Sequence, residues 1–250
     1  MESADERANG GASFNTTRWT MVLACEDEAD TARAHEALAG LFQTYWYPLY
    51  AYVRRRGYGE QDAEDLVQAF CLHLQEKHAI AKADRQRGKF RTFLLSSLQN
   101  FLGHEYERSR AQKRGGGQEL IRLDAEQADA RYRLEPAHTI TPEVLFEKRW
   151  AHALLEQTLA SLRADFVSRG KGRLFDALSS FLTSDLRETS YQAAATQLAL
   201  PLSAIKTTVH RLRRDYREKL RDEIGRTVAS PDEVDDELLY LRKVLGSAGS

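Results

Sequence analysis

Apolar residues recur at helical spacing in several separate segments of the chain. Between residues 60 and 78 they follow the i, i+3, i+4, i+7 series of an amphipathic helix: Ala63, Leu66, Val67, Phe70, Cys71 and Leu74. The same criterion predicts helices from Asp30 to Tyr45, from Pro48 to Arg56 and from Phe90 to about Arg114. Gly57 is placed to end the second of these, because glycine tolerates the backbone conformation of a helix C-terminus. Residues 1–13 show no such pattern and are expected to be disordered.

The pattern changes between residues 118 and 140, where mixed polar sequence with a proline predicts an inter-domain linker. Thr141 and Pro142 then form a helix start signal, and apolar spacing carries that helix to about Val167. Further helices are predicted over Leu174–Leu182, Ser190–Leu200, Ser203–Arg226 and Asp232–Val244.

The pattern contains no credible strand and no internal repeat, so the predicted fold class is all-α. Two helical lobes are expected, over residues 31–115 and 141–228, joined by a linker at 116–140. An N-terminal extension (1–30) and an acidic C-terminal tail (229–250) flank them.

Composition supports a helical protein. Only 5 of 250 residues are proline and 15 are glycine, while 42% are hydrophobic and 29% charged. Two cysteines, Cys25 and Cys71, exclude a disulfide scaffold and a thiolate metal cluster. The N-terminus does not read as a signal peptide, and no apolar run reaches the roughly 18 residues of a membrane span. We therefore expect a soluble, cytoplasmic protein with no membrane contact, no metal and no cofactor.

The formal net charge of -1 averages over strongly segregated charges. Residues 82–114 carry nine Lys and Arg against three acids, and residues 203–221 carry seven against two. Residues 222–240 reverse this, with seven acids against one arginine. Two basic segments indicate an anionic partner contacted at two places, although ordinary solvated helix faces would give the same pattern.

Residues 190–214 carry the strongest local signal. A short helix, a tight turn at Ala199-Leu200-Pro201 and a longer helix capped by Ser203 predict helix-turn-helix geometry. The outward face of the second helix would present side chains able to contact phosphates and base edges: Lys206, Thr207, His210, Arg211 and Arg214. A helical hairpin with a basic surface remains the alternative.

Residues 62–70 form a second distinctive segment, Asp-Ala-Glu-Asp-Leu-Val-Gln-Ala-Phe. Its apolar residues fall on one face, which leaves Asp62, Glu64, Asp65 and Gln68 on the polar side. Patterns typical of enzymes are lacking: Gly170-Lys171-Gly172-Arg173 lacks the phosphate-loop spacing, and His104-Glu105 has no second histidine four residues on.

With these two segments the chain resembles the sigma-70 family of bacterial RNA polymerase initiation factors, in its small extracytoplasmic-function (ECF) subgroup and in an extended variant. Residues about 38–114 are similar to the family's second conserved region, through segments 41–45, 54–57, 62–70 and 90–108. Residues about 150–224 are similar to its fourth region. Phe93 stands where tryptophan is common, Ala193-Ala194-Ala195 replaces the usual Glu-Ile-Ala, and the turn lacks glycine.

The resemblance implies a non-enzymatic transcription initiation factor whose partners are core RNA polymerase and promoter DNA, with an anti-sigma protein as a further candidate. It implies polymerase binding by Asp62, Glu64, Asp65 and Gln68. For opening of the minus-ten element it points to Arg85, Arg87, Lys89, Phe90, Arg91, Asn100 and Arg108, although the phenylalanines of this segment fit the core better than base stacking. For the minus-thirty-five element it points to Ser203, Lys206, Thr207, His210, Arg211, Arg213 and Arg214.

Two other classes of protein remain open. An autonomous helix-turn-helix regulator with an N-terminal sensor or partner-binding lobe would dimerise and bind a palindromic site alone, whereas a sigma factor needs core polymerase. A helical adaptor without a DNA role would require both basic segments to be incidental. The acidic residues 222–240 follow the second basic segment directly, so they are also predicted to mask it.

Overall fold

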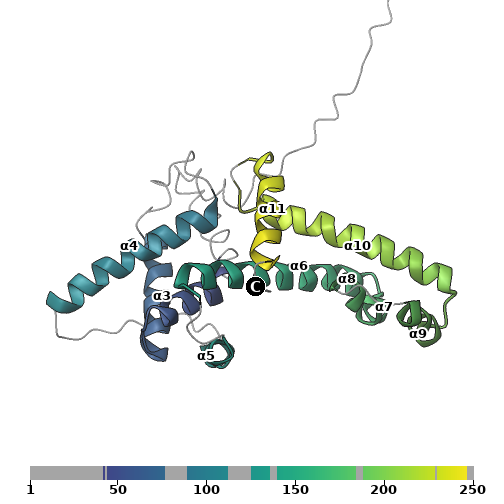
Figure 1. Cartoon of the computed structure of the whole chain (residues 1–250), viewed down its shortest axis with the longest axis horizontal. Helices are drawn as coiled ribbons and strands as arrows, with labels where there is room; N and C mark the ends of the chain where they lie inside the picture. The colour runs from purple at the N-terminus through teal and green to yellow at the C-terminus, as the bar shows by residue number, and fades with distance from the viewer. Residues whose placement is uncertain are drawn as a thin grey trace, which may run out of the picture.

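The computed structural model describes residues 42, 44–76, 89–111, 125–135, 140–183, 188–228 and 230–246. The predicted N-terminal helix start at Asp30, the N-terminal extension and the basic loop with Arg85 and Arg87 lie outside these residues. Within the described part every regular element is a helix, as the all-α prediction required. A helix over residues 44–55 is followed by the elements labelled in Figure 1: α3 (Glu60–Glu76), α4 (Phe90–Ala111), α5 (Ala125–Arg133), α6 (Pro142–Ser168), α7 (Gly172–Leu178), α8 (Ser180–Thr183), α9 (Glu188–Leu198), α10 (Leu202–Gly225) and α11 (Glu233–Gly246).

The helix over residues 44–55 is the centre of the larger hydrophobic core. It is buried nearly all round, which is the pattern of a helix with neighbours on every side. The prediction that Pro48 begins a new helix is wrong, because the helix continues through it. A proline there removes only one backbone hydrogen bond, and burial of the neighbouring Tyr45 and Tyr52 holds the helix together. Gly57 ends the helix as predicted, with a φ of 97°.

Two long helices connect the larger core to a smaller one. The N-terminal half of α6 packs in the larger core through Leu145 and Trp150, and Leu162 lies in the smaller core. α10 runs between the same cores, with Val209 in the smaller and Ile224 in the larger. The two cores therefore share α6 and α10, in addition to the segment 116–140 that was predicted to join the two lobes.

The ends of α6 follow local rules. The side chain of Thr141 caps its N-terminus by accepting a hydrogen bond from the Val144 N–H at 3.3 Å, and Pro142 occupies the first turn, as predicted. Its C-terminus closes at Gly170, which has a φ of 70°, while the Lys171 N–H donates to the Phe166 carbonyl at 2.8 Å. The helix predicted over Leu174–Leu182 is interrupted at Ser179, between α7 and α8.

The predicted linker contains a helix, α5, which is held to the 44–55 helix by polar contacts. Asp129, only 2% exposed, accepts a hydrogen bond from the Tyr50 hydroxyl at 3.1 Å and pairs with Arg54 at 3.2 Å and Arg133 at 2.7 Å. Burial alone would raise the pKa of Asp129, but the Tyr50 hydrogen bond and the two arginines lower it below its usual range. Part of the linker is thus a docked element.

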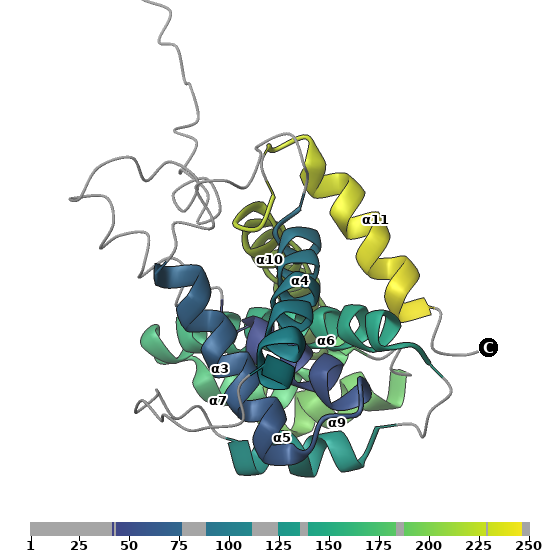
Figure 2. The same ribbon diagram turned by 90° about the vertical axis from the view of Figure 1, so that its left-hand side faces the viewer.

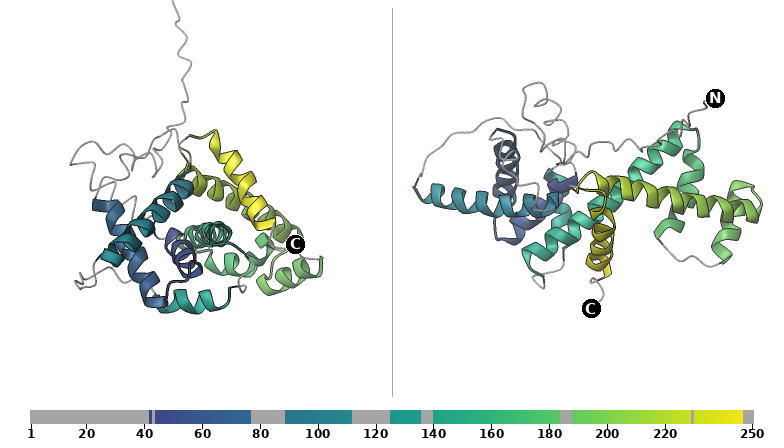
Figure 3. Two further views of the ribbon diagram at one scale, coloured as in Figure 1. Left: turned by 60° about the vertical axis from the view of Figure 1, so that its left-hand side comes forward. Right: turned by 90° about the horizontal axis from the view of Figure 1, so that it is seen from above.

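The views agree on the placement of the other long helices. α4 and α10 extend toward opposite ends of the molecule, and α11 lies between them (Figures 1 and 3). Seen from the end that α4 occupies, α3 and α11 lie on opposite sides of α4 (Figure 2). None of the described helices is long and apolar enough to span a membrane.

Candidate nucleic-acid interface

The polar face of α3 matches its prediction except at one position. Asp62 and Asp65 are exposed and Glu64 is half-buried, whereas Gln68 is only 8% exposed. The Gln68 amide donates to the Glu64 carboxylate at 3.0 Å, so it is turned along the helix and into its packed side. The prediction that Gln68 faces a partner is wrong in this arrangement, and the acidic face comprises Asp62, Glu64 and Asp65.

The first turn of α4 is anchored inside the protein. Phe90 is fully buried, its ring lies 5.1 Å edge-on from that of Tyr45, and its N–H donates to the Thr227 carbonyl at 3.1 Å. Arg91 is 7% exposed. Neither side chain is accessible to DNA in this arrangement, which contradicts their prediction as direct contacts. Phe90, Leu94 and Leu98 lie four residues apart on the apolar face of α4, and this spacing accounts for the burial of Phe90.

The remaining candidates of the first basic segment differ in accessibility. Lys89 is half-buried, and Asn100 is exposed on the outer face of α4. Arg108 lies within α4, toward its free end. The sequence reading overlooked Tyr106, which is 59% exposed on the same part of the helix and is the kind of aromatic side chain that stacks on bases.

The segment 188–225 forms a helix-turn-helix. α9 ends at Leu198. The next residue, Ala199, has a φ of 50° in the left-handed region, and the Leu200 N–H donates to the Ala195 carbonyl at 3.1 Å. An alanine therefore takes the backbone conformation for which glycine is usual. α10 begins at Leu202 after Pro201, so Ser203 lies in its first turn and is not the cap that was predicted.

The outward face of α10 is basic and open. Ser203, Lys206, Thr207, His210, Arg211 and Arg214 are exposed. Thr207 donates its hydroxyl to the Ser203 carbonyl at 3.0 Å, and Arg214 pairs with Asp215 at 3.1 Å. Arg213 is half-buried and donates to the Phe181 carbonyl at 3.0 Å, so it fixes α10 to α8. Apolar residues Ile205, Val209 and Leu212 hold the opposite face in the smaller core.

Burial raises the pKa of the Cys71 thiol to about 12, so the thiol stays protonated and acts as a packing group. No cluster of three or more His, Cys, Asp or Glu able to hold a metal occurs among the residues that the structure describes. Among the described residues, the arrangement offers an all-helical scaffold with an acidic face on α3 and a basic face on α10.

A comparison with protein-family models matches the part of the chain that holds α3 and α4. Residues 41–111, which contain the 44–55 helix, α3 and α4, match the family model described as sigma-70 region 2. This match supports a sigma-70 family factor, as the sequence resemblance predicted. Comparisons with curated proteins and with solved structures return no match.

The region 2 match supports a coarse function. Region 2 supports a role in promoter recognition and transcription initiation, with core RNA polymerase and promoter DNA as the partners it implies. Sigma factors are transcription factors and not enzymes.

Proposed function

We propose that the chain is an ECF-type sigma factor that docks on core RNA polymerase with α3, opens the minus-ten element with α4 and reads the minus-thirty-five element with α10. The observation that carries this proposal is the region 2 match over residues 41–111, which covers α3 and α4 in one segment. Such a factor would act in the bacterial cytoplasm, where the polymerase and the promoters are. The lobes proposed for these tasks are residues 31–115 and 141–228.

Docking by α3 is supported by how its side chains are shared between core and surface. Ala63, Val67 and Phe70 are fully buried, while Asp62 and Asp65 on the other side are exposed. Charge reversal at an exposed position leaves the buried face intact, so the effect on binding can be separated from an effect on folding.

The test of docking is co-purification of core polymerase with Asp65→Arg. We expect this variant to keep its helical circular dichroism and to lose core binding. Glu156→Arg makes the same charge change on α6, where the side chain is 63% exposed, and should bind core as wild type does. Equal core binding by the folded Asp65→Arg variant and wild type would show that α3 is not the docking face.

Reading by α10 is supported by the order of the polar side chains along its exposed face. Lys206 and His210 lie one turn apart near the start, where a recognition helix meets base edges, and Arg214 lies further along toward the phosphates. A base-edge contact is worth about 1–3 kcal/mol at its own base pair, whereas a phosphate contact weakens binding to all sequences alike.

The test is run-off transcription by the holoenzyme from a promoter-variant library at several salt concentrations. Lys206→Ala should flatten the preference at one or two upstream positions. Arg214→Ala should lower affinity uniformly and reduce the salt slope by about one. If Lys206→Ala lowers transcription from every promoter variant by the same factor, α10 binds DNA by charge alone and does not recognise its sequence. Specific promoter binding that needs core polymerase also separates a sigma factor from an autonomous regulator, which would bind a palindromic site alone.

A further inference from the structure

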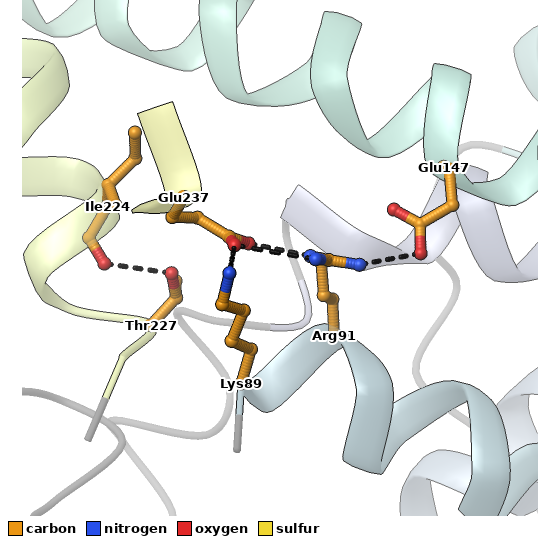
Figure 4. Close-up of polar contacts among 6 residues, drawn as sticks. All are labelled: Lys89, Arg91, Glu147, Ile224, Thr227 and Glu237. Carbon is orange, nitrogen blue, oxygen red and sulfur yellow. Dashed lines mark hydrogen bonds and ion pairs between the residues drawn. The ribbon is translucent and has the colours of Figure 1, made fainter. Parts of the chain in front are cut away.

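The C-terminal helix α11 inserts one carboxylate between two cations at the start of α4 (Figure 4). The Glu237 carboxylate accepts hydrogen bonds from Arg91 Nε at 2.6 Å and NH2 at 3.4 Å, and it pairs with Lys89 Nζ at 2.5 Å. The remaining guanidinium nitrogen of Arg91, NH1, pairs with the Glu147 carboxylate of α6 at 2.7 Å. Two cations and two carboxylates thus form a compact neutral cluster.

This cluster is sealed from solvent by aromatic and apolar groups. The Glu237 side chain is 1% exposed and that of Arg91 is 8% exposed. The Tyr240 ring of α11 covers the guanidinium, with 3.9 Å from Arg91 Cζ to the ring centroid. Val234, Leu241 and Val244 of α11 are buried in the larger core, so the helix is seated by an apolar face as well as by charge.

Lys89 and Arg91 are also two of the cations to which the sequence resemblance points for the minus-ten element. Arg91 is buried in this arrangement and becomes accessible to DNA only when α11 leaves it. A guanidinium bound in bidentate fashion by a carboxylate is in the geometry with which it binds a phosphate. Glu237 therefore holds the guanidinium edge that a backbone phosphate of DNA would need. Both anions cannot hold the same guanidinium edge at once, so α11 and DNA must compete for it.

We propose that α11 is an autoinhibitory element that masks Lys89 and Arg91 and that promoter DNA must displace. This inference rests on the proposed function and adds an intramolecular competitor to it. Charge alone predicted that the acidic residues mask the second basic segment, whereas this proposal places the masking at Lys89 and Arg91. α11 reaches α10 through the exposed Arg221–Asp235 pair at 2.5 Å, near the end of α10, whereas Lys206, His210 and Arg211 at its beginning stay exposed.

The test compares Glu237→Gln with Asp236→Asn in the full chain. Both changes remove one negative charge from α11, but Asp236 is exposed while Glu237 holds the two cations. The probe is a labelled single-stranded oligonucleotide of mixed sequence, titrated by fluorescence anisotropy over a range of salt concentrations. Backbone contacts by Lys89 and Arg91 do not depend on sequence, so the promoter need not be known.

Glu237→Gln should raise the affinity about tenfold, the weight of one charge-assisted hydrogen bond. Release of two cations should also steepen the salt dependence by about 1.4 in slope for a single strand. Asp236→Asn should behave as wild type. Equal affinities and slopes for the two variants would overturn the proposal.

A second measurement needs no variant. In wild-type holoenzyme, amide hydrogen exchange of residues 233–246 should quicken when a transcribed promoter fragment binds, because α11 must leave its seat. Unchanged protection would overturn the proposal even if transcription proceeds. Run-off transcription by the same holoenzyme tests the proposed function separately: transcription with α11 still protected refutes the autoinhibition alone, and no transcription with core polymerase refutes the sigma-factor function.

Discussion

The strongest test of the packing between α5 and the 44–55 helix is replacement of Asp129 by alanine. This change removes the acceptor of the Tyr50 hydroxyl at 3.1 Å and the partner of Arg54 at 3.2 Å. Loss of a buried hydrogen bond to a charged group costs about 1.5–3 kcal/mol, and Arg54 is left largely buried without its carboxylate. Arg133 adds little, because 74% of its side chain is exposed. We expect Asp129→Ala to lower the free energy of unfolding by about 2–3 kcal/mol.

A matched control separates the contribution of burial to an ion pair from that of its hydrogen-bond geometry. Asp176 makes an equally well-formed pair with Arg163, at 2.8 and 3.1 Å, but both side chains are about half exposed. Asp176→Ala should therefore cost less than about 1 kcal/mol. Urea denaturation followed by circular dichroism measures both values, and hydrogen exchange should show that residues 125–133 lose protection only in Asp129→Ala. Equal losses for the two variants would refute the argument from burial.

Three further outcomes are expected. The pKa of Asp129 is lowered in the folded protein, so the stability that its carboxylate contributes is complete above the unfolded-state pKa of about 3.9 and is lost as pH falls through the folded-state pKa. The difference in unfolding free energy between wild type and Asp129→Asn should therefore shrink from about pH 5 to pH 3 in urea titrations. Leu98→Ala and Leu212→Ala lie in different cores that α6 and α10 connect, so each should cost about 2–5 kcal/mol and shift one shared calorimetric transition; two separate transitions would contradict this coupling. Ala199→Gly should stabilise the protein by about 1 kcal/mol in urea denaturation, since the φ of 50° strains alanine and suits glycine; a loss of stability would contradict this.

Helices with strong periodicity could be predicted from the sequence to within a few residues. The α10 prediction of Ser203–Arg226 compares with Leu202–Gly225, and the start of α6 at Pro142 was anticipated from its capping signal. Local pattern failed where tertiary contacts decide the conformation. α5 is nine residues long and strongly polar, and it is held by Asp129 and by Arg131 stacked over the Tyr47 ring at 4.3 Å.

The same limit explains the errors at the candidate site. Arg91 reads as a surface cation in a basic segment, but its partner Glu237 lies 146 residues further along the chain. No spacing rule connects two residues at that separation. Gln68 was assigned outward because it is polar, and only the packing around α3 reveals that its amide is turned toward Glu64. The exposed face of α10 was predictable because an amphipathic helix carries its own orientation in its sequence.

The sharing of α6 and α10 between the two cores also limits how far apart the two ends of the molecule can be. Phe90 at the start of α4 is hydrogen-bonded to Thr227 beside the end of α10, so the two helices meet there. With 22 and 24 residues at a rise of 1.5 Å, α4 and α10 measure about 70 Å even if laid in one line. Elements named for positions ten and thirty-five are about 25 base pairs apart, which is about 85 Å of straight DNA. Reading both at once would therefore require either bent DNA or the opening of one core along α6 or α10, so the promoter spacing bears directly on the stability of this packing.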